Sequence, residues 1–239
     1  MPKILEFANK ASQPFKIQNK SATKAEIILY AGIGQDWWGD GSMISAKQFS
    51  DELKKLDDTV NEITVRINSP GGDVFDGITI YNRLKQHKAK VVVHIDGLAA
   101  SIASIIALAG DEVHIGEGAL YMVHLPWTFA MGNRMDLDNT VSRLLDVEEQ
   151  MIGIYAKKTG LGRSEIKALL EAESWLNADE AVEKGFVDSK VEETMPIAAS
   201  AIDARWINRK PKTYKSMASA ISVAKDELKN KIQSRIARK

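Results

Sequence analysis

A run of β-branched residues followed at once by small residues lies near the middle of this chain. Residues 91–95 (VVVHI) are typical of a buried strand. The small residues of 97–104 (GLAASIAS) follow, and we expect them to lead into a helix that continues to Gly110. This order places Ser101 near a strand-to-helix turn, where a hydroxyl lies beside backbone N–H groups that can receive negative charge. Ser101 is therefore a candidate nucleophile, although small residues here are equally consistent with a tightly packed helix.

The rest of the chain alternates strand patterns with helix patterns. We expect further strands at 26–30, 62–68, 112–115 and 120–123, and further helices at 45–56, 75–84, 135–159, 164–170 and 178–184. Ser45 with Gln48, and Asn177 with Glu180, have the spacing of capping boxes at helix starts. Such alternation predicts an α/β fold with a mostly parallel sheet.

Composition indicates a globular protein of a reducing compartment. The chain has 239 residues, 44% of them hydrophobic, which is enough for a substantial core, and it has no cysteine. The longest apolar stretch, residues 98–109, has the length of a buried helix and not of a membrane span. The first residues lack the apolar region of a signal peptide. We expect a cytoplasmic protein with no membrane partner.

Charge divides the chain into an acidic body and a basic tail. Residues 204–239 hold 11 basic and 2 acidic residues, a net charge of +9, and the rest of the chain carries −9. Apolar residues of the tail recur at helical spacing from Ile221 to Ile236, with lysines and arginines largely off that stripe. We therefore expect a polar, strand-poor lead-in at 1–24, a main domain at 25–194, and a linker with a basic amphipathic helix at 195–239. The tail either docks on its own acidic body or binds an assembly partner.

Three features beside Ser101 suggest nucleophilic catalysis. Gly71 and Gly72 follow a buried strand, so backbone N–H groups can approach a ligand there, as in an oxyanion hole, although a tight turn would also use them. His124 ends a strand and is placed to act as a base. An acid that orients the histidine is expected in the stretch 171–176. Of the other histidines, His94 is assigned to the core, and the remaining two have no partner pattern.

Four segments in order resemble the ClpP family of serine proteases, and more narrowly its phage and prophage branch, the head maturation proteases. The segments are 66–75 (RINSPGGDVF), 96–104 (DGLAASIAS), 121–127 (YMVHLPW) and 175–181 (WLNADEA). The resemblance extends from about residue 25 to residue 191. It implies a crotonase-like ββα superhelix and stacked rings of subunits that enclose a proteolytic chamber.

The same resemblance implies residue roles. Ser101 matches the nucleophile and His124 the general base, while Gly72 and Ile102 match the amides of the oxyanion hole. The third triad position departs from the housekeeping proteases, because it holds Glu173 where they have aspartate. A glutamate can still accept the imidazole N–H, and Glu171 is its nearest competitor. Such chemistry requires no cofactor and no metal.

Three functions remain open at this stage. We favour a serine endopeptidase that acts on scaffold or capsid proteins during phage head maturation, in the host cytoplasm or in the assembling prohead. The first alternative is a housekeeping degradative subunit served by an ATP-driven unfoldase; the polar residues 1–24 do not resemble the apolar gating loop of such subunits. The second is a non-proteolytic enzyme or scaffold of the crotonase fold, which would not need Ser101, His124 and Glu173 together.

Overall fold

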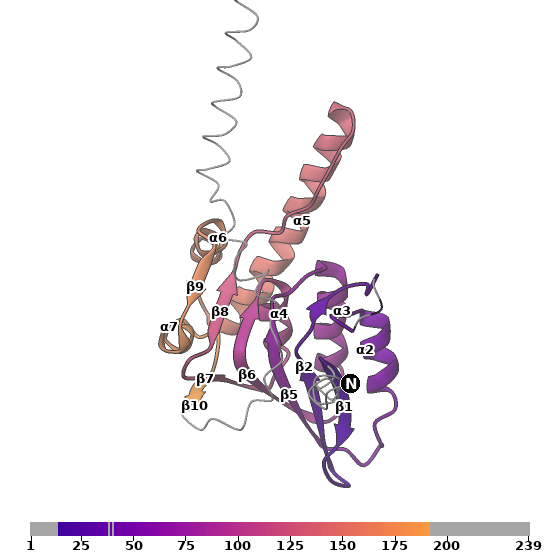
Figure 1. The fold of residues 1–239 in the computed structure, drawn as a ribbon. Coiled ribbons are helices and arrows are strands. Elements are labelled where there is room, and N and C mark those ends of the chain that lie inside the picture. Colours follow the sequence, from indigo (N-terminus) through magenta and orange to yellow (C-terminus); the bar gives the residue numbers. More distant parts are fainter. Residues whose placement is uncertain (1–13, 38, 40, 192–239) are drawn as a thin grey trace, which may run out of the picture. The chain divides into compact units, whose positions relative to one another are not determined.

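The computed structural model describes residues 14–191 except 38 and 40 (Figure 1). The predicted linker and basic helix at 195–239 lie outside the described residues. The strands are β1 (Phe15–Asn19), β2 (Lys24–Leu29), β3 (Gly32–Ile33), β4 (Met43–Ile44), β5 (Glu62–Ser69), β6 (Lys90–Ala100), β7 (Glu112–Gly116), β8 (Leu120–Val123), β9 (Ser174–Leu176) and β10 (Ser189–Val191). The helices are α2 (Ala46–Leu53), α3 (Val74–Lys85), α4 (Ile102–Ala107), α5 (Arg134–Thr159), α6 (Arg163–Glu171) and α7 (Ala178–Glu183).

One mostly parallel sheet organises the described chain, as the alternating pattern predicts. Its strand order is β1-β2-β5-β6-β7-β10, with β8 paired to β6 and β9 paired to β8. Only the β1–β2 and β8–β9 pairs of this sheet are antiparallel. Alternate residues of β2, β5 and β6 are buried, and they form the main core with α2, α3 and α4. The fold is α/β, as the sequence predicts.

Strand β6 divides its length between two neighbours. Its first half pairs with β7 (Ile95 with Ile115), and its second half pairs with β8 (Ala100 with Met122). Because β8 then pairs with β9, the ends of β6 and β8 and the start of β9 meet at one edge of the sheet. That edge holds the candidate active site.

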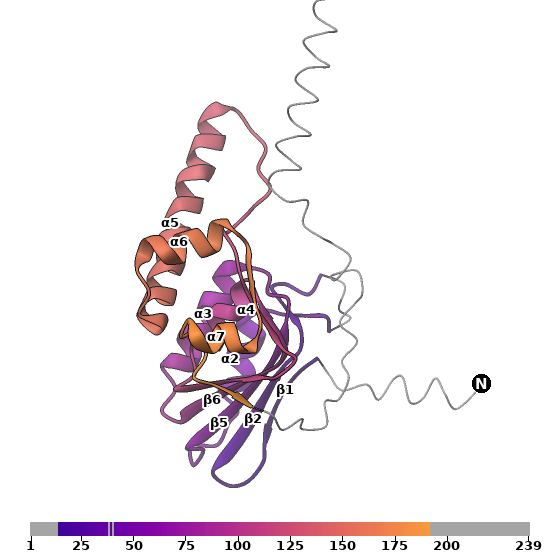
Figure 2. The ribbon, with the colours of Figure 1, turned by 90° about the vertical axis from the view of Figure 1, so that its left-hand side faces the viewer.

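Helix α5 is buried only near its C-terminal end. Met151, Ile152 and Tyr155 are its buried residues. In Figure 1 and Figure 2 its N-terminal half projects away from the sheet, alongside the segment that follows β8. Met135 and Val141, both on that half, are exposed. The described fold therefore leaves apolar side chains of α5 uncovered.

Several sequence expectations are wrong in detail. Strand β1 lies within the segment expected to be poor in strands, and it pairs with β2 from Phe15 to Asn19. The small residues from Gly97 to Ala100 continue β6 instead of starting the helix, because β8 supplies a second pairing partner there. Helix α2 has 8 residues, about two turns instead of three, and the Ser45 side chain caps it by accepting from the Gln48 N–H.

His94 also differs from its predicted place in the core. It lies on the less buried face of the sheet, in register with Arg66 on β5 and His114 on β7. The rings of His94 and His114 are 5.0 Å apart, and His114 Nδ1 lies 2.8 Å from the Ser189 hydroxyl. Cross-strand register created these partners, so the local sequence around each histidine could not indicate them.

Candidate active site

Ser101 occupies the single residue between β6 and α4. Its backbone has φ 55° and ψ −130°, a conformation that costs an L-residue roughly 1–3 kcal/mol. Two anchors hold it: the Ser101 N–H donates to the Met122 carbonyl on β8 at 2.9 Å, and the Ser101 carbonyl accepts from the Ser104 N–H at 3.0 Å. The predicted strand-to-helix turn at Ser101 is thereby confirmed, and it is sharper than the sequence indicates.

His124 lies directly after β8, within hydrogen-bond distance of this serine. Its Nε2 is 2.7 Å from Ser101 Oγ. The ring is largely buried, and this burial lowers the pKa of His124, while the charge of Glu173 partly opposes the shift by favouring the protonated ring. A lowered pKa keeps the imidazole neutral at neutral pH, which is the form that can accept the serine proton.

Glu173 lies opposite His124 across the β8–β9 pair. Val123 pairs with Ser174 in antiparallel register, so the residue that follows β8 faces the residue that precedes β9. Glu173 is partly buried and has φ 49°. Among the described residues, Glu173 and Ser101 are the two non-glycine residues with a positive φ. Within residues 14–191, no hydrogen bond joins Glu173 to His124, and the two interact through charge.

Glu171 is less well placed. It is the last residue of α6 and is exposed, and it does not contribute to the pKa shift of His124. The geometry therefore favours Glu173 over Glu171 as the acid.

The glycine pair after β5 lies against the same serine. A methyl group on Gly71, where φ is 86°, would come within 2.8 Å of the Ser101 Cβ and 3.0 Å of the Ile102 nitrogen. Gly72 is exposed and forms an isolated bridge with Ile33, whose N–H donates to the Gly71 carbonyl at 2.8 Å. The loop is thus held next to the start of α4, and only glycine permits so close an approach.

Two backbone amides are free to bind an anion beside Ser101. Ile102 is the first residue of α4, so its N–H has no partner within that helix. Helix and sheet ladders aside, the backbone hydrogen bonds of the described residues include none donated by Gly72 or Ile102. Of the residues that the sequence singled out, the structure places His124 within hydrogen-bond distance of Ser101 and Ile102 directly after it. Gly72 adjoins the Gly71 contact with Ser101, and Glu173 is near enough to His124 to influence its pKa.

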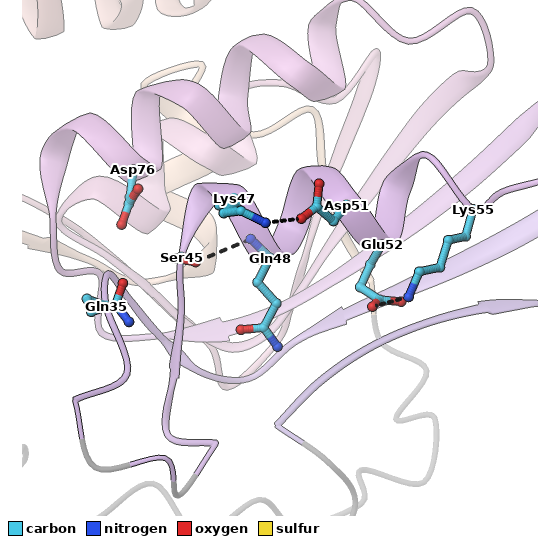
Figure 3. A pocket seen from close by; sticks show the side chains of 8 residues that line it. All are labelled: Gln35, Ser45, Lys47, Gln48, Asp51, Glu52, Lys55 and Asp76. Atoms are coloured by element: carbon cyan, nitrogen blue, oxygen red, sulfur yellow. Dashed lines mark hydrogen bonds and ion pairs between the residues drawn. The ribbon is translucent and has the colours of Figure 1, made fainter.

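A polar hollow at the start of α2 is separate from this cluster (Figure 3). Four of its charged side chains pair with each other on α2 and the turn after it: Lys47 lies 2.5 Å from Asp51, and Lys55 lies 2.5 Å from Glu52. None of the three triad candidates lines it. Across the described residues, no group of three or more metal-ligating side chains converges, and no helix is long and apolar enough to cross a membrane.

The sequence did not indicate the buried hydroxyl groups that are hydrogen-bonded to the backbone of Ser101 and to each other. The Ser104 hydroxyl donates to the Ser101 carbonyl at 2.5 Å and lies 2.6 Å from the Tyr155 hydroxyl of α5. The sequence indicates Ser104 only as a small helical residue and Tyr155 only as one position of an apolar stripe. No local signal connects residues 51 positions apart.

Comparison with known proteins gives consistent results. A family model described as Clp protease matches residues 16–194, which is most of the chain. Among solved structures, a ClpP1 mutant from Listeria monocytogenes superposes with a TM-score of 0.57 and 26% sequence identity, covering 68% of this chain and 89% of that chain.

Proposed function

The chain belongs to the Clp protease family of serine-type endopeptidases, and we propose that Ser101, His124 and Glu173 form its catalytic triad. The observation that carries the proposal is the 2.7 Å contact between His124 Nε2 and Ser101 Oγ. A nucleophile and a base within hydrogen-bond distance are the minimum that serine hydrolysis requires.

The mechanism follows from the positions of these groups. Ser101 Oγ attacks the peptide carbonyl carbon while its proton passes to His124 Nε2. The protonated imidazole then donates that proton to the leaving amine, and the acyl-enzyme forms. Water then loses a proton to the same nitrogen and attacks the acyl carbon. As the acyl–oxygen bond breaks, His124 returns that proton to Ser101 Oγ and the free serine is restored. Glu173 stabilises the positive imidazole through its charge.

The oxyanion of the tetrahedral intermediate is assigned to the amides of Gly72 and Ile102. Ile102 directly follows Ser101, and Gly72 directly follows Gly71, which packs against Ser101. Among the described residues, neither N–H donates to a backbone group outside the helix and sheet ladders. One such donor is worth about a hundredfold or more in rate. An extended substrate added as a strand would be recognised mainly by its backbone, which gives low sequence selectivity.

We further propose that the chain assembles into stacked rings that enclose these sites. The support is a set of exposed apolar side chains on the projecting half of α5 and on the segment before it: Trp127, Phe129, Met131, Met135, Leu137, Val141 and Leu145. So many exposed apolar side chains indicate a surface that another subunit covers.

For the biological role, we propose processing of scaffold or capsid proteins during phage head assembly. The four sequence motifs resemble the head maturation branch, and residues 1–24 lack the apolar character of a gating loop. A self-sufficient assembly protease degrades a long unstructured polypeptide without ATP, whereas a subunit served by an unfoldase requires that partner and ATP. A long unstructured substrate, incubated with the purified chain alone, separates the two roles.

Covalent labelling tests the catalytic assignment. A fluorophosphonate probe should modify the intact protein at Ser101, and the Ser101→Ala variant should take up no probe. Peptide mapping by mass spectrometry locates the adduct. A label on another serine, or undiminished labelling of Ser101→Ala, would overturn the assignment.

A further inference from the structure

The backbone carbonyl of the candidate nucleophile receives two hydrogen bonds from one residue. Ser104 donates to the Ser101 oxygen through its own N–H at 3.0 Å and through its hydroxyl at 2.5 Å. The first bond belongs to an ordinary helical turn. The second is specific to a residue with a hydroxyl at this position.

The direction of the hydrogen bonds extends this contact to α5. A serine hydroxyl has a single proton, and Ser104 must use it toward the Ser101 carbonyl, because a carbonyl oxygen only accepts. In the 2.6 Å contact between Ser104 and Tyr155, the tyrosine is therefore the donor. The result is a directed chain from the Tyr155 hydroxyl, through the Ser104 hydroxyl, to the Ser101 carbonyl.

The side chains of this hydrogen-bond chain are fully buried. Ser104 and Tyr155 are both 0% exposed. Burial raises the pKa of Tyr155, so the phenol retains its proton at any physiological pH. Its ring packs edge-on against Phe186, with the ring centres 5.7 Å apart, which fixes the direction of the hydroxyl. In such an enclosed setting, hydrogen bonds that point the same way strengthen one another.

Planarity of the peptide bond transmits this constraint to the reacting side. The Ser101 carbonyl and the Ile102 N–H belong to one planar peptide group, and they point in opposite directions. Fixing the carbonyl toward Ser104 therefore fixes the N–H on the opposite side of the plane. This N–H is one of the two assigned to the oxyanion, and rotation about the Ser101 ψ angle would turn it away.

We propose that Ser104 and Tyr155 are positioning residues that hold the Ser101–Ile102 peptide in the orientation needed to stabilise the oxyanion. The proposal rests on the catalytic role of Ser101 proposed above. It assigns a role in catalysis to a tyrosine of α5 that does not touch the substrate.

A matched pair of tyrosines tests it. Tyr155→Phe removes only the hydroxyl that begins the chain. Tyr121→Phe is the control: its hydroxyl is equally buried and donates at 2.7 Å to the carbonyl of the same Ser104, but it does not belong to the chain that ends at Ser101. Both variants lose one buried hydroxyl and keep the ring, so a general effect on packing should appear in both.

The expected results separate kcat from KM. Tyr155→Phe should lower kcat for a fluorogenic peptide about five- to tenfold, the effect of one hydrogen bond, with KM unchanged. Ser104→Ala should lower kcat at least as much. The Ser104→Ala/Tyr155→Phe double variant should be little worse than Ser104→Ala, because the tyrosine acts through the serine. Tyr121→Phe should stay within about twofold of the unmodified protein, and the acid limb of the pH profile should not move in any variant.

Two outcomes would overturn the positioning role: equal loss of kcat in Tyr121→Phe and Tyr155→Phe, or a rise in KM with kcat unchanged. If Ser104→Ala does not fold, the comparison of the two tyrosine variants decides alone. Fluorophosphonate labelling separates this proposal from the catalytic one. If the probe does not label the protein without substitutions, the role of Ser101 itself is overturned. If folded Tyr155→Phe shows normal labelling and normal turnover, only the role of the tyrosine is overturned.

Discussion

Substitution of Gly71 by alanine should inactivate the enzyme more than it unfolds it. The added methyl group would lie 2.5 Å from the Ala100 carbonyl oxygen and 2.8 Å from the Ser101 Cβ, whereas ordinary contact begins at 3.4 Å. Relief therefore requires a movement of about 0.6–0.9 Å in the backbone that carries the nucleophile. A misplacement of about 1 Å in a catalytic group can cost roughly a hundredfold in rate, so kcat should fall by about that factor.

Gly160→Ala is the control for the cost of placing a side chain on a residue with a positive φ. It also has a positive φ, 75° against 86°, and a methyl group there would meet nothing within 4 Å. Gly160→Ala should cost about 1–2 kcal/mol of stability through the left-handed conformation alone, with normal kcat. In urea denaturation, Gly71→Ala should lower the free energy of unfolding by more than Gly160→Ala does.

The assays are initial rates at saturating peptide and urea unfolding of both variants. A kcat for Gly71→Ala within about twofold of that for Gly160→Ala would refute the argument that the glycine loop sets the position of Ser101.

Five other predictions follow from the site and the assembly. Ser101→Ala and His124→Ala should each abolish most peptide hydrolysis, and the double variant should be little worse than either, because the two groups act as a unit; near-normal rates in either purified variant would contradict this. The acid limb of kcat/KM should lie below the ordinary histidine pKa of about 6.5, since burial lowers the pKa of His124 and only the neutral ring accepts the proton. Glu173→Gln should lower kcat and move this limb to still lower pH, because it removes the charge that raises the pKa, whereas Glu171→Gln should do neither; the reverse result would reassign the acid. The mass of the native protein in solution should be a multiple of the 26.4 kDa chain, and a monomer at micromolar concentration would contradict the assembly. Truncation after Val191 should preserve hydrolysis of a short peptide and abolish a salt-sensitive association with an acidic assembly partner; loss of peptidase activity would place the tail in the catalytic body.

Where the local pattern and the tertiary contacts favour the same structure, the sequence was sufficient to predict the element. The alternation at 62–68 appears as β5, and the strand expected at 120–123 is β8 with the same bounds. Asn177 and Glu180 form both bonds of the predicted capping box. In each case the signal lies within a few residues of the element it predicts.

Elements that depend on distant partners were not predictable in this way. Residues 97–100 are glycine, leucine and two alanines, a composition with little strand preference, and β8 makes them a strand by pairing with them. The positive φ of Glu173 could not be predicted from the sequence either, because glutamate rarely adopts a positive φ. It lies two residues after the last residue of α6, and the Glu173 N–H donates to the Leu170 carbonyl at 3.1 Å, so the end of that helix fixes the conformation.

The two explanations for the small residues around Ser101, tight packing and catalysis, describe one arrangement. A methyl group on Gly77 of α3 would lie 2.1 Å from the Ile102 side chain, so α3 and α4 meet at a point that only glycine allows. Gly71, three residues before α3, makes the corresponding close contact with Ser101. Gly72 lies between these two contacts in the sequence, so the close packing of α3 on α4 fixes the loop that carries it. The small residues are therefore needed for packing, and the same packing holds against each other the two segments that carry the proposed oxyanion donors, Gly72 and Ile102.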